Sequence, residues 1–372
     1  MNKTEVLKRL DAAIGRPLVP LTRILAGGRR WKSTKIRNIL FIRPGGIGDA
    51  VLLLPGIDHV KQTFPEASVD VLCEGRNAGV FGMTAAIRRT YLYDGGIELL
   101  RCMTNRYDVV IDTEQWHRLS AIVAAATQAP IRLGFDTNNR GTLFTHKIAY
   151  SHDDYEAVSF ANLIALLTGQ LFPFDHDEPF IGLADVDIPG GLSLSGGESD
   201  RFVAIFPGAS VRERRWGGQN YGMVAGALSN RGYTPVILGA GADKADAAEI
   251  SRHCNQCINL TGKTTLVQSA VVLKVSRLLI SADSGLLHIA VGVGTPTVSL
   301  FGSGVRGKWA PRGKAHRVIS AGLGCSPCTR FGYTPPCKIG VKCLTSITPE
   351  EITEAALQVL AEKEAHLAIN NS

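Results

Sequence analysis

The chain has 372 residues, of which 45% are hydrophobic and 20% charged, an ordinary composition for a globular protein of about two domains. No apolar run reaches the ~18 residues that a membrane-spanning helix needs, and no secretory signal is recognisable, so a cytoplasmic location is expected. The net charge of +7 is concentrated in residues 1–37, which hold ten Lys and Arg against two Asp and Glu. The rest of the chain is close to neutral and gives no reason to expect nucleic-acid binding.

The first 37 residues predict a basic amphipathic arm. Apolar residues at helical spacing predict a helix over residues 4–16, which Pro17 and Pro20 are expected to end because proline lacks the backbone N–H. Further apolar residues up to Trp31 stand among arginines and a lysine. Such an arm suits the anionic inner surface of a membrane. The alternative is a helix that docks on the body with its charged face in water.

A first α/β domain is predicted over residues 38–182. Residues 38–43 are an apolar run that ends in a glycine-rich turn, which is typical of a buried parallel strand. We expect further strands at 68–73 and 108–112, and helices at 49–64 and 117–128. This alternation of strands and helices predicts a doubly wound α/β domain.

A second α/β domain is predicted over residues 201–372, after a linker at 183–200 that is rich in Gly, Ser and Asp. It has the same alternation, with strands at 202–206, 234–238, 278–281 and 297–301 and helices at 219–231 and 242–253. The final helix begins with a capping box, formed by Thr348, Pro349 and Glu351. Two Rossmann-like domains are expected to face a central ligand cleft at the carboxyl ends of their strands.

The first motif with chemical content is the loop Arg43-Pro-Gly-Gly-Ile-Gly-Asp49, which joins a strand to a helix. Its glycines let the backbone turn tightly and approach a ligand. Asp49 stands at the expected start of the helix, so helix capping is the alternative explanation for it. Glu74 could imitate the ribose-binding acid of a dinucleotide site. However, Val51 occupies the position of the third Gly or Ala, which argues against that kind of site.

The second motif is Phe206-Pro-Gly-Ala-Ser210, followed by Arg212-Glu-Arg-Arg-Trp216. It also follows a predicted strand. Ser210 offers a hydroxyl group, while Arg212, Arg214 and Arg215 can give charge-assisted hydrogen bonds to a diphosphate. The alternative is a basic loop whose charges are only solvated.

The third motif is Ser281-Ala-Asp-Ser-Gly-Leu-Leu-His288. A helix is expected to start at Ser284 or Gly285, where its unpaired N–H groups would form an anion site. Asp283 has helix capping as its alternative role, and His288 has the alternative of a core histidine.

Four cysteines lie close together in the loop 325–343, with the spacing Cys325-x2-Cys328-x8-Cys337-x5-Cys343. In a reducing compartment, four thiolates at this spacing predict a structural Zn or Fe site. The alternative is a loop of unligated thiols.

Taken together, the motifs resemble those of the ADP-heptose:lipopolysaccharide heptosyltransferases, glycosyltransferase family 9, over residues 38–362. The resemblance rests on residues 39–55, Pro207-Gly-Ala-Ser210, Arg215-Trp216, Leu260-Thr-Gly-Lys263, Asp283-Ser-Gly-Leu-Leu-His288, Phe301-Gly302 and Cys325-Ser-Pro-Cys328.

The resemblance implies an α/β protein of GT-B type that transfers a sugar from a nucleotide-sugar donor to a lipid-linked glycan, with inversion and without a cofactor. It implies that Asp49 is the general base. The residues expected to bind the donor are Ser210, Arg214, Arg215, Asp283, Ser284, Gly285 and His288. The residues expected to contact the acceptor, from their position at strand ends in the first domain, are Gly45, Gly46, Glu114 and Arg118.

The chain departs from the family pattern at Arg214, where many members have lysine two residues before the tryptophan. Charge is kept, but a guanidinium group binds oxygens with a different geometry from an ammonium group. Two alternatives therefore stay open. One is transfer of another nucleotide sugar, and the other is a non-catalytic relative that binds a glycan or a membrane.

Overall fold

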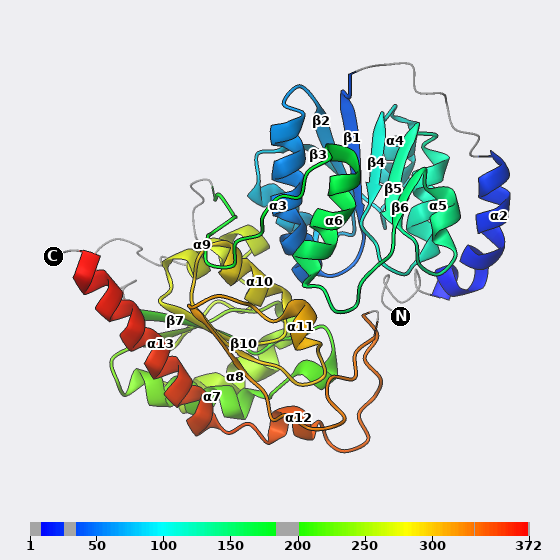
Figure 1. Cartoon of the computed structure of the whole chain (residues 1–372). Helices are drawn as coiled ribbons and strands as arrows, with labels where there is room; N and C mark the ends of the chain where they lie inside the picture. Colours follow the sequence, from blue (N-terminus) through cyan, green and yellow to red (C-terminus); the bar gives the residue numbers. More distant parts are fainter. Residues whose placement is uncertain (1–8, 26–34, 184–200, 331, 371–372) are drawn as a thin grey trace. The chain divides into compact units, whose positions relative to one another are not determined.

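The chain forms two compact units, residues 1–174 and Asp175–Ser372, in a computed structural model that describes residues 9–25, 35–183, 201–330 and 332–370 (Figure 1). This division precedes the predicted domain end at residue 182. The backbone N–H groups of Phe180 and Ile181 donate to the carbonyl of Gly292, which ties this segment to the second unit. Beyond residue 183, the predicted linker lies outside the described residues. No described helix is both long and apolar enough to cross a bilayer.

The first unit is built on a sheet of six parallel strands in the order β3-β2-β1-β4-β5-β6. The strands are β1 Asn38–Arg43, β2 Ser68–Cys73, β3 Ile87–Leu92, β4 Val109–Asp112, β5 Ile131–Phe135 and β6 His146–Ile148. The predicted strands at 38–43, 68–73 and 108–112 are confirmed, whereas β3, β5 and β6 were not predicted.

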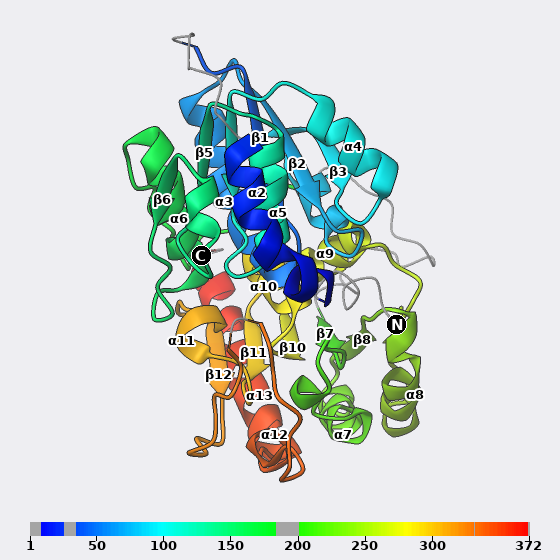
Figure 2. The ribbon, with the colours of Figure 1, turned by 90° about the vertical axis from the view of Figure 1, so that its right-hand side faces the viewer.

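Helices cover both faces of this sheet (Figures 1 and 2). They are α3 Ile47–Thr63, α4 Gly96–Thr104, α5 Arg118–Ala126 and α6 Glu156–Thr168, with the short 3-10 helices η2 Ala78–Met83 and η3 Arg140–Leu143. Cys102 of α4 and Ala121 of α5 share one buried cluster with Leu40 and Ile42 of β1, so α4 and α5 cover the same face.

The N-terminal arm is helical from residue 9 to residue 25, with a π-helical segment η1 Asp11–Gly15 followed by α2 Arg16–Leu25. The prediction that Pro17 and Pro20 end the helix is wrong. Pro17 stands two residues after the π-helical segment, where the chain departs from the regular α-helical hydrogen-bond pattern. Tertiary packing stabilises the rest, because Val19 is buried in the cluster beneath α4 and α5.

The second unit has the same architecture, a sheet of six parallel strands in the order β12-β11-β10-β7-β8-β9. The strands are β7 Phe202–Phe206, β8 Thr234–Ile237, β9 Ile258–Asn259, β10 Leu278–Ala282, β11 Thr297–Leu300 and β12 His316–Ile319. The helices are α7 Gly218–Ser229, α8 Lys244–His253, α9 Leu266–Val275, α10 Gly285–Gly292, α11 Arg306–Trp309, α12 Lys342–Thr345 and α13 Pro349–Asn370, with 3-10 helices η5 Arg212–Arg214 and η6 Gly241–Asp243. All the elements predicted for this domain are present, within a few residues at their ends.

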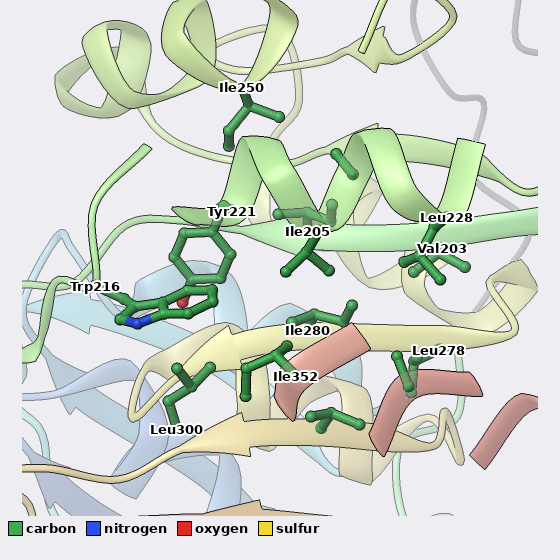
Figure 3. Packing of buried hydrophobic residues seen from close by; sticks show 14 of the residues in the cluster. Val203, Ile205, Trp216, Tyr221, Leu228, Ile250, Leu278, Ile280, Leu300 and Ile352 are labelled. Carbon is green, nitrogen blue, oxygen red and sulfur yellow. The ribbon is translucent and has the colours of Figure 1, made fainter. Parts of the chain in front are cut away.

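The core of the second unit packs the sheet against α7 and α13 (Figure 3). The ring of Trp216 lies 4.9 Å from that of Tyr221 in a T-shaped contact, and its indole N–H donates to the carbonyl of Ile347. Trp216 is thus a core residue that anchors the arginine-rich segment before it. The predicted capping box is confirmed, because Thr348 and Glu351 exchange side-chain-to-backbone hydrogen bonds.

In each sheet the strand order reverses at one central pair, β1 with β4 in the first unit and β7 with β10 in the second. Ligands of open parallel sheets bind outside the carboxyl ends of the strands at such a reversal, because adjacent loops there run in opposite directions. The three predicted loops follow β1, β7 and β10. The fold therefore places all three motifs where a ligand site is expected.

Candidate functional site

Asp49 lies in the first turn of α3, which begins at Ile47 with Gly46 as its N-cap. Asp49 is the third residue of the helix and does not occupy the N-cap position itself, in contrast to the alternative explanation given above. Instead Oδ2 accepts a hydrogen bond from Nη2 of Arg43 at 3.0 Å, and 21% of the side chain is exposed.

Arg43, the last residue of β1, supplies a buried positive charge beside this carboxylate. Its Nη1 donates to the carbonyl of Thr113 at 2.7 Å, and its guanidinium group lies over the ring of Phe160. Burial alone would lower the pKa of Arg43, but neighbouring carboxylates, Asp49 first among them, raise it above its ordinary value. The guanidinium group is therefore a fixed cation that orients Asp49.

Gly45 and Gly46 leave room beside these two charged groups. Gly45 has a φ of +116°, which favours glycine, and a Cβ there would lie 3.3 Å from Nη2 of Arg43. A Cβ on Gly46 would lie 3.7 Å from Oδ2 of Asp49. The fold thus brings both predicted glycines together with Asp49.

Two other carboxylates near Arg43 are buried and already accept hydrogen bonds from neighbouring groups. Glu114 accepts the backbone N–H groups of Gln115 and Trp116, and Glu156 accepts hydrogen bonds from the side chains of Gln115 and Tyr150. Burial alone would raise the pKa of Glu114, but positive neighbours and these N–H groups hold it at about 2. Glu114 is therefore a permanent anion, which leaves Asp49 as the carboxylate of this group that reaches solvent.

Arg118 makes contacts within the first unit, and its predicted acceptor contact stays a prediction. Its Nε donates to the backbone carbonyl of Asn138 at 3.0 Å, and Nη2 donates to the side-chain oxygen of the same residue. Its Nη1 also lies 4.0 Å from Oδ2 of Asp11 in the arm. These contacts join α5, the loop before η3 and the arm.

The second unit gathers its candidate residues around an ion pair. Nη1 of Arg214 lies 2.9 Å from Oδ2 of Asp283, and the guanidinium group also lies over the ring of Trp309. A Cβ at Gly304 would come within 2.0 Å of the same Asp283 oxygen, so this position requires glycine. Asp283 does not cap α10. It pairs with Arg214, whereas the sequence predicted a direct contact with the donor.

The start of α10 lies directly after Asp283. Ser284 is its N-cap, and its hydroxyl oxygen accepts the N–H of Leu287 at 3.3 Å. The N–H groups of Gly285 and Leu286 belong to the first turn, where a helix attracts anions. His288 is only 2% exposed, which favours its alternative role as a core histidine.

Arg215 turns away from this ion pair. Its guanidinium group donates to the carbonyl of Ala209 and pairs with Asp243 at 3.0 Å and Asp246 at 3.1 Å. Arg215 therefore holds the loop 207–210 against α8, and its predicted donor contact stays a prediction. Ser210, the last residue of this loop, is exposed.

The four cysteines of the loop 325–343 do not form a metal site among the described residues, where no group of three or more possible ligands is suitably placed. All four are free thiols. Burial, and then the charges of Cys328, Cys337 and Cys325, raise the pKa of the Cys343 thiol. Residue 331 within this loop lies outside the described residues.

Sequence reasoning assigned no role to the residues that hold these sites. Arg43 was part of the first motif, but nothing in the sequence indicated that it pairs with Asp49. Nη2 of Arg214 donates a hydrogen bond to Oγ1 of Thr329 at 3.5 Å. The place of Thr329 next to the cysteine motif was the only available signal, and it did not indicate this contact.

Comparison with known proteins gives a consistent picture. A family model described as glycosyltransferase family 9 (heptosyltransferase) matches residues 98–337. Lipopolysaccharide heptosyltransferase 3 of Escherichia coli is 27% identical over 290 residues, which cover 71% of this chain and 83% of that protein.

Solved structures show the same fold. The ADP-heptose lipopolysaccharide heptosyltransferase II of E. coli has a TM-score of 0.69 at 21% identity and covers 88% of this chain and 99% of its own. The iron-containing dodecameric glycosyltransferase TibC of enterotoxigenic E. coli has a TM-score of 0.58 at 13% identity, with 89% and 78% covered. At these identities the likeness shows the fold alone, and it confirms the predicted GT-B type.

Proposed function

Because the chain belongs to glycosyltransferase family 9, we propose that it transfers a heptose from ADP-heptose to a lipopolysaccharide core, with inversion at the anomeric carbon. The names of its relatives support the sugar and the acceptor class. The observation that carries the proposal is the partly exposed Asp49 carboxylate, held by a buried arginine at the end of β1.

In the proposed reaction an acceptor hydroxyl oxygen attacks the anomeric carbon while the bond from that carbon to the diphosphate oxygen breaks. Asp49 takes the proton of the hydroxyl group as the new bond forms. Glu114 is a poor alternative base, because its pKa of about 2 gives it little affinity for a proton. An attack opposite to the leaving diphosphate inverts the anomeric centre.

The diphosphate leaves with its negative charge, and the second unit supplies groups to hold it. Arg214 offers a cation, while the first N–H groups of α10 offer a pre-oriented anion site. Asp283 keeps the guanidinium group in place rather than touching the phosphate oxygens, because two anions repel. This arrangement supports a reaction without a catalytic metal ion.

A donor panel tests this proposal. The full-length protein would be incubated with ADP-heptose, ADP-glucose and UDP-sugars, with and without an extracted lipid-core acceptor and with and without EDTA. Among the donors, we expect only ADP-heptose to give sugar transfer, and only when the acceptor is present. The rate should be the same with and without EDTA. Transfer from another donor would replace the proposed sugar. An absence of transfer from any donor would favour a non-catalytic, glycan-binding relative.

We also propose that the first unit lies on the anionic inner surface of the cytoplasmic membrane, where its acceptor is anchored. Three large apolar side chains are exposed on the arm, namely Leu10, Ile14 and Leu21, and two more on α4, Ile97 and Leu100. Helix α4 packs on one face of the sheet, the arm packs against α5, which covers the same face, and the arm adds exposed arginines at positions 9 and 16. Exposed apolar and basic side chains together suit anionic lipid headgroups.

Replacing Ile97 and Leu100 by serine is expected to weaken binding to phosphatidylglycerol vesicles by roughly tenfold per residue, since each buried side chain contributes about 1.5 kcal/mol. Vesicle co-sedimentation measures this. Leu166→Ser, an exposed leucine on α6, is the matched control and should leave binding unchanged. Equal binding by the double variant and the control would reject this surface.

A structural metal ion in the cysteine loop is a separate proposal, which rests on the thiol spacing and on the iron of TibC and requires the four thiols to move closer together than they lie in the described structure. It takes no part in the reaction proposed above. Metal analysis of protein purified without chelators should find about one Zn or Fe per chain, and Cys328→Ser should remove it. A clearly substoichiometric content in the wild-type protein would mean that the loop contains only thiols.

A further inference from the structure

Asp11 connects the N-terminal helix to the start of α5. It is 4% exposed, and its Oδ1 accepts the backbone N–H of Leu119 at 2.7 Å, although the two residues are 108 positions apart. Leu119 is the second residue of α5, whose own N-cap, His117, provides no side-chain cap. Asp11 therefore caps the start of α5, a role that the N-cap residue next to the helix normally fills.

Charge strengthens this contact. Oδ2 of Asp11 lies 3.6 Å from Nδ1 of His117 and 4.0 Å from Nη1 of Arg118. A carboxylate at a helix N-terminus is also favoured by the helix dipole. The arm also lies close to α5, because a Cβ on Gly15 would lie 3.2 Å from Cβ of Arg118 and 3.3 Å from Oδ1 of Asp11.

The start of α5 is continuous with the residues around the proposed base. The segment between β4 and α5 contains Glu114 and Gln115, and Oε1 of Gln115 accepts a hydrogen bond from Nη2 of Arg43 at 3.4 Å. The same Nη2 donates to Asp49. Glu114 in turn accepts the N–H groups of the residues that lead into α5. A shift of the first turn of α5 would therefore displace the side chains that surround Asp49.

We propose that the N-terminal helix is a positioning element of the acceptor site and that Asp11 is the residue through which it acts. The inference rests on the proposed function, because the acceptor is assigned to this unit. Asp11 does not touch the substrate. It fixes the start of α5 and the segment 113–117, so that the acceptor meets a pre-ordered surface beside Asp49. An arm that served only to reach a membrane would not need a buried carboxylate on its inner face.

Two variants test the contact in different ways. Asp11→Ala removes the cap and the charge, whereas Gly15→Val keeps Asp11 but forces the arm away from α5. A lost helix cap corresponds to a factor of roughly 2 to 30 in an equilibrium. We expect both variants to raise the KM for a water-soluble core-oligosaccharide acceptor within that range, with little change in the KM for the donor. Asp11→Asn, which keeps an acceptor oxygen, should lie between Asp11→Ala and the wild type.

Glu98→Gln is the matched control, since it removes a carboxylate from the first turn of the neighbouring helix α4 without touching α5. It should leave both KM values unchanged. Hydrogen exchange provides a readout that does not depend on turnover. Peptides covering residues 113–122 should exchange faster in Asp11→Ala and Gly15→Val, while peptides of the second unit should not change.

The outcomes separate this inference from the proposed function. If the wild-type protein transfers sugar but Asp11→Ala keeps the wild-type acceptor KM, the positioning role is wrong and the proposed function stands. If no transfer is found with any donor, the hydrogen-exchange result alone still shows whether Asp11 holds α5. A lower kcat with both KM values raised to the same extent, together with faster exchange throughout the first unit, would mean that Asp11 only stabilises the fold.

Discussion

Replacing Asp49 by asparagine is expected to lower kcat by roughly 10²- to 10⁴-fold, the contribution that a positioned general base makes. The amide has nearly the same shape and can still accept a hydrogen bond from Arg43, but it cannot take up the proton of the acceptor hydroxyl group. Substrate binding should change little, so the KM values for donor and acceptor should stay within a few fold. Steady-state transfer assays with both substrates varied would measure this separation.

Asp58→Asn is the appropriate control for that experiment. Asp58 is on the same helix, α3, and accepts a hydrogen bond from Thr84, but it makes no contact with Arg43. The control should keep its activity. If Asp49→Asn retained more than about a tenth of the wild-type kcat, the base would have to be another group, because general-base catalysis contributes more than this.

A loss of stability in Asp49→Asn must be measured beside the loss of activity. Arg43 is buried, and a buried cation that loses its partner is costly. Two further carboxylates, Glu114 and Glu156, also raise the pKa of Arg43, so part of its compensation remains. We therefore expect a modest fall in melting temperature that does not account for the fall in kcat.

The positions of the candidate sites could be predicted from the sequence because they depend on local patterns. An apolar run followed by glycines predicts a strand and a tight turn, and the run at residues 38–43 became β1. The three loops with chemical content follow strands that are paired at the centre of each sheet. Parallel topology then brings loops of the same sheet together, since the carboxyl ends of parallel strands lie at one edge of the sheet.

The partners of the charged residues could not be predicted, because they are set by contacts between distant segments. Asp11 and Leu119 are far apart in sequence, and no local pattern indicates that one caps the helix of the other. The end of the arm helix was misplaced for a similar reason. Burial of Val19 stabilises the helix beyond Pro17, and burial of this kind arises only in the folded chain.

The three neighbouring arginines show most clearly that contacts with distant residues cannot be predicted from the sequence. Arg212, Arg214 and Arg215 are equivalent in sequence, as three basic residues after a strand. The 3-10 helix η5 separates them in space, so that Arg212 is exposed, Arg214 meets Asp283 and Arg215 meets Asp243. Their different surroundings predict different consequences for substitution.

Arg214→Ala is expected to lower kcat/KM for the donor by roughly 10²- to 10³-fold, as the loss of one charge-stabilising group in a transition state does. The departing diphosphate would keep the N–H groups of α10 but lose its cation, and Asp283 would then face it without compensation. Arg214→Lys should recover only part of the rate, because an ammonium group cannot pair with Asp283 and a phosphate oxygen in the same planar geometry. Donor binding by calorimetry and transfer kinetics together would measure the effect.

The two adjacent arginines serve as controls with opposite expected results. Arg212→Ala should change neither stability nor transfer, because Arg212 is exposed and lies outside the ion pair. Arg215→Ala should lower the melting temperature, since it removes the link from Ala209 to Asp243 and Asp246. Its effect on catalysis should be smaller than that of Arg214→Ala when both are measured well below their melting temperatures. If Arg215→Ala abolished donor binding while Arg214→Ala did not, the assignment of the two guanidinium groups would have to be exchanged.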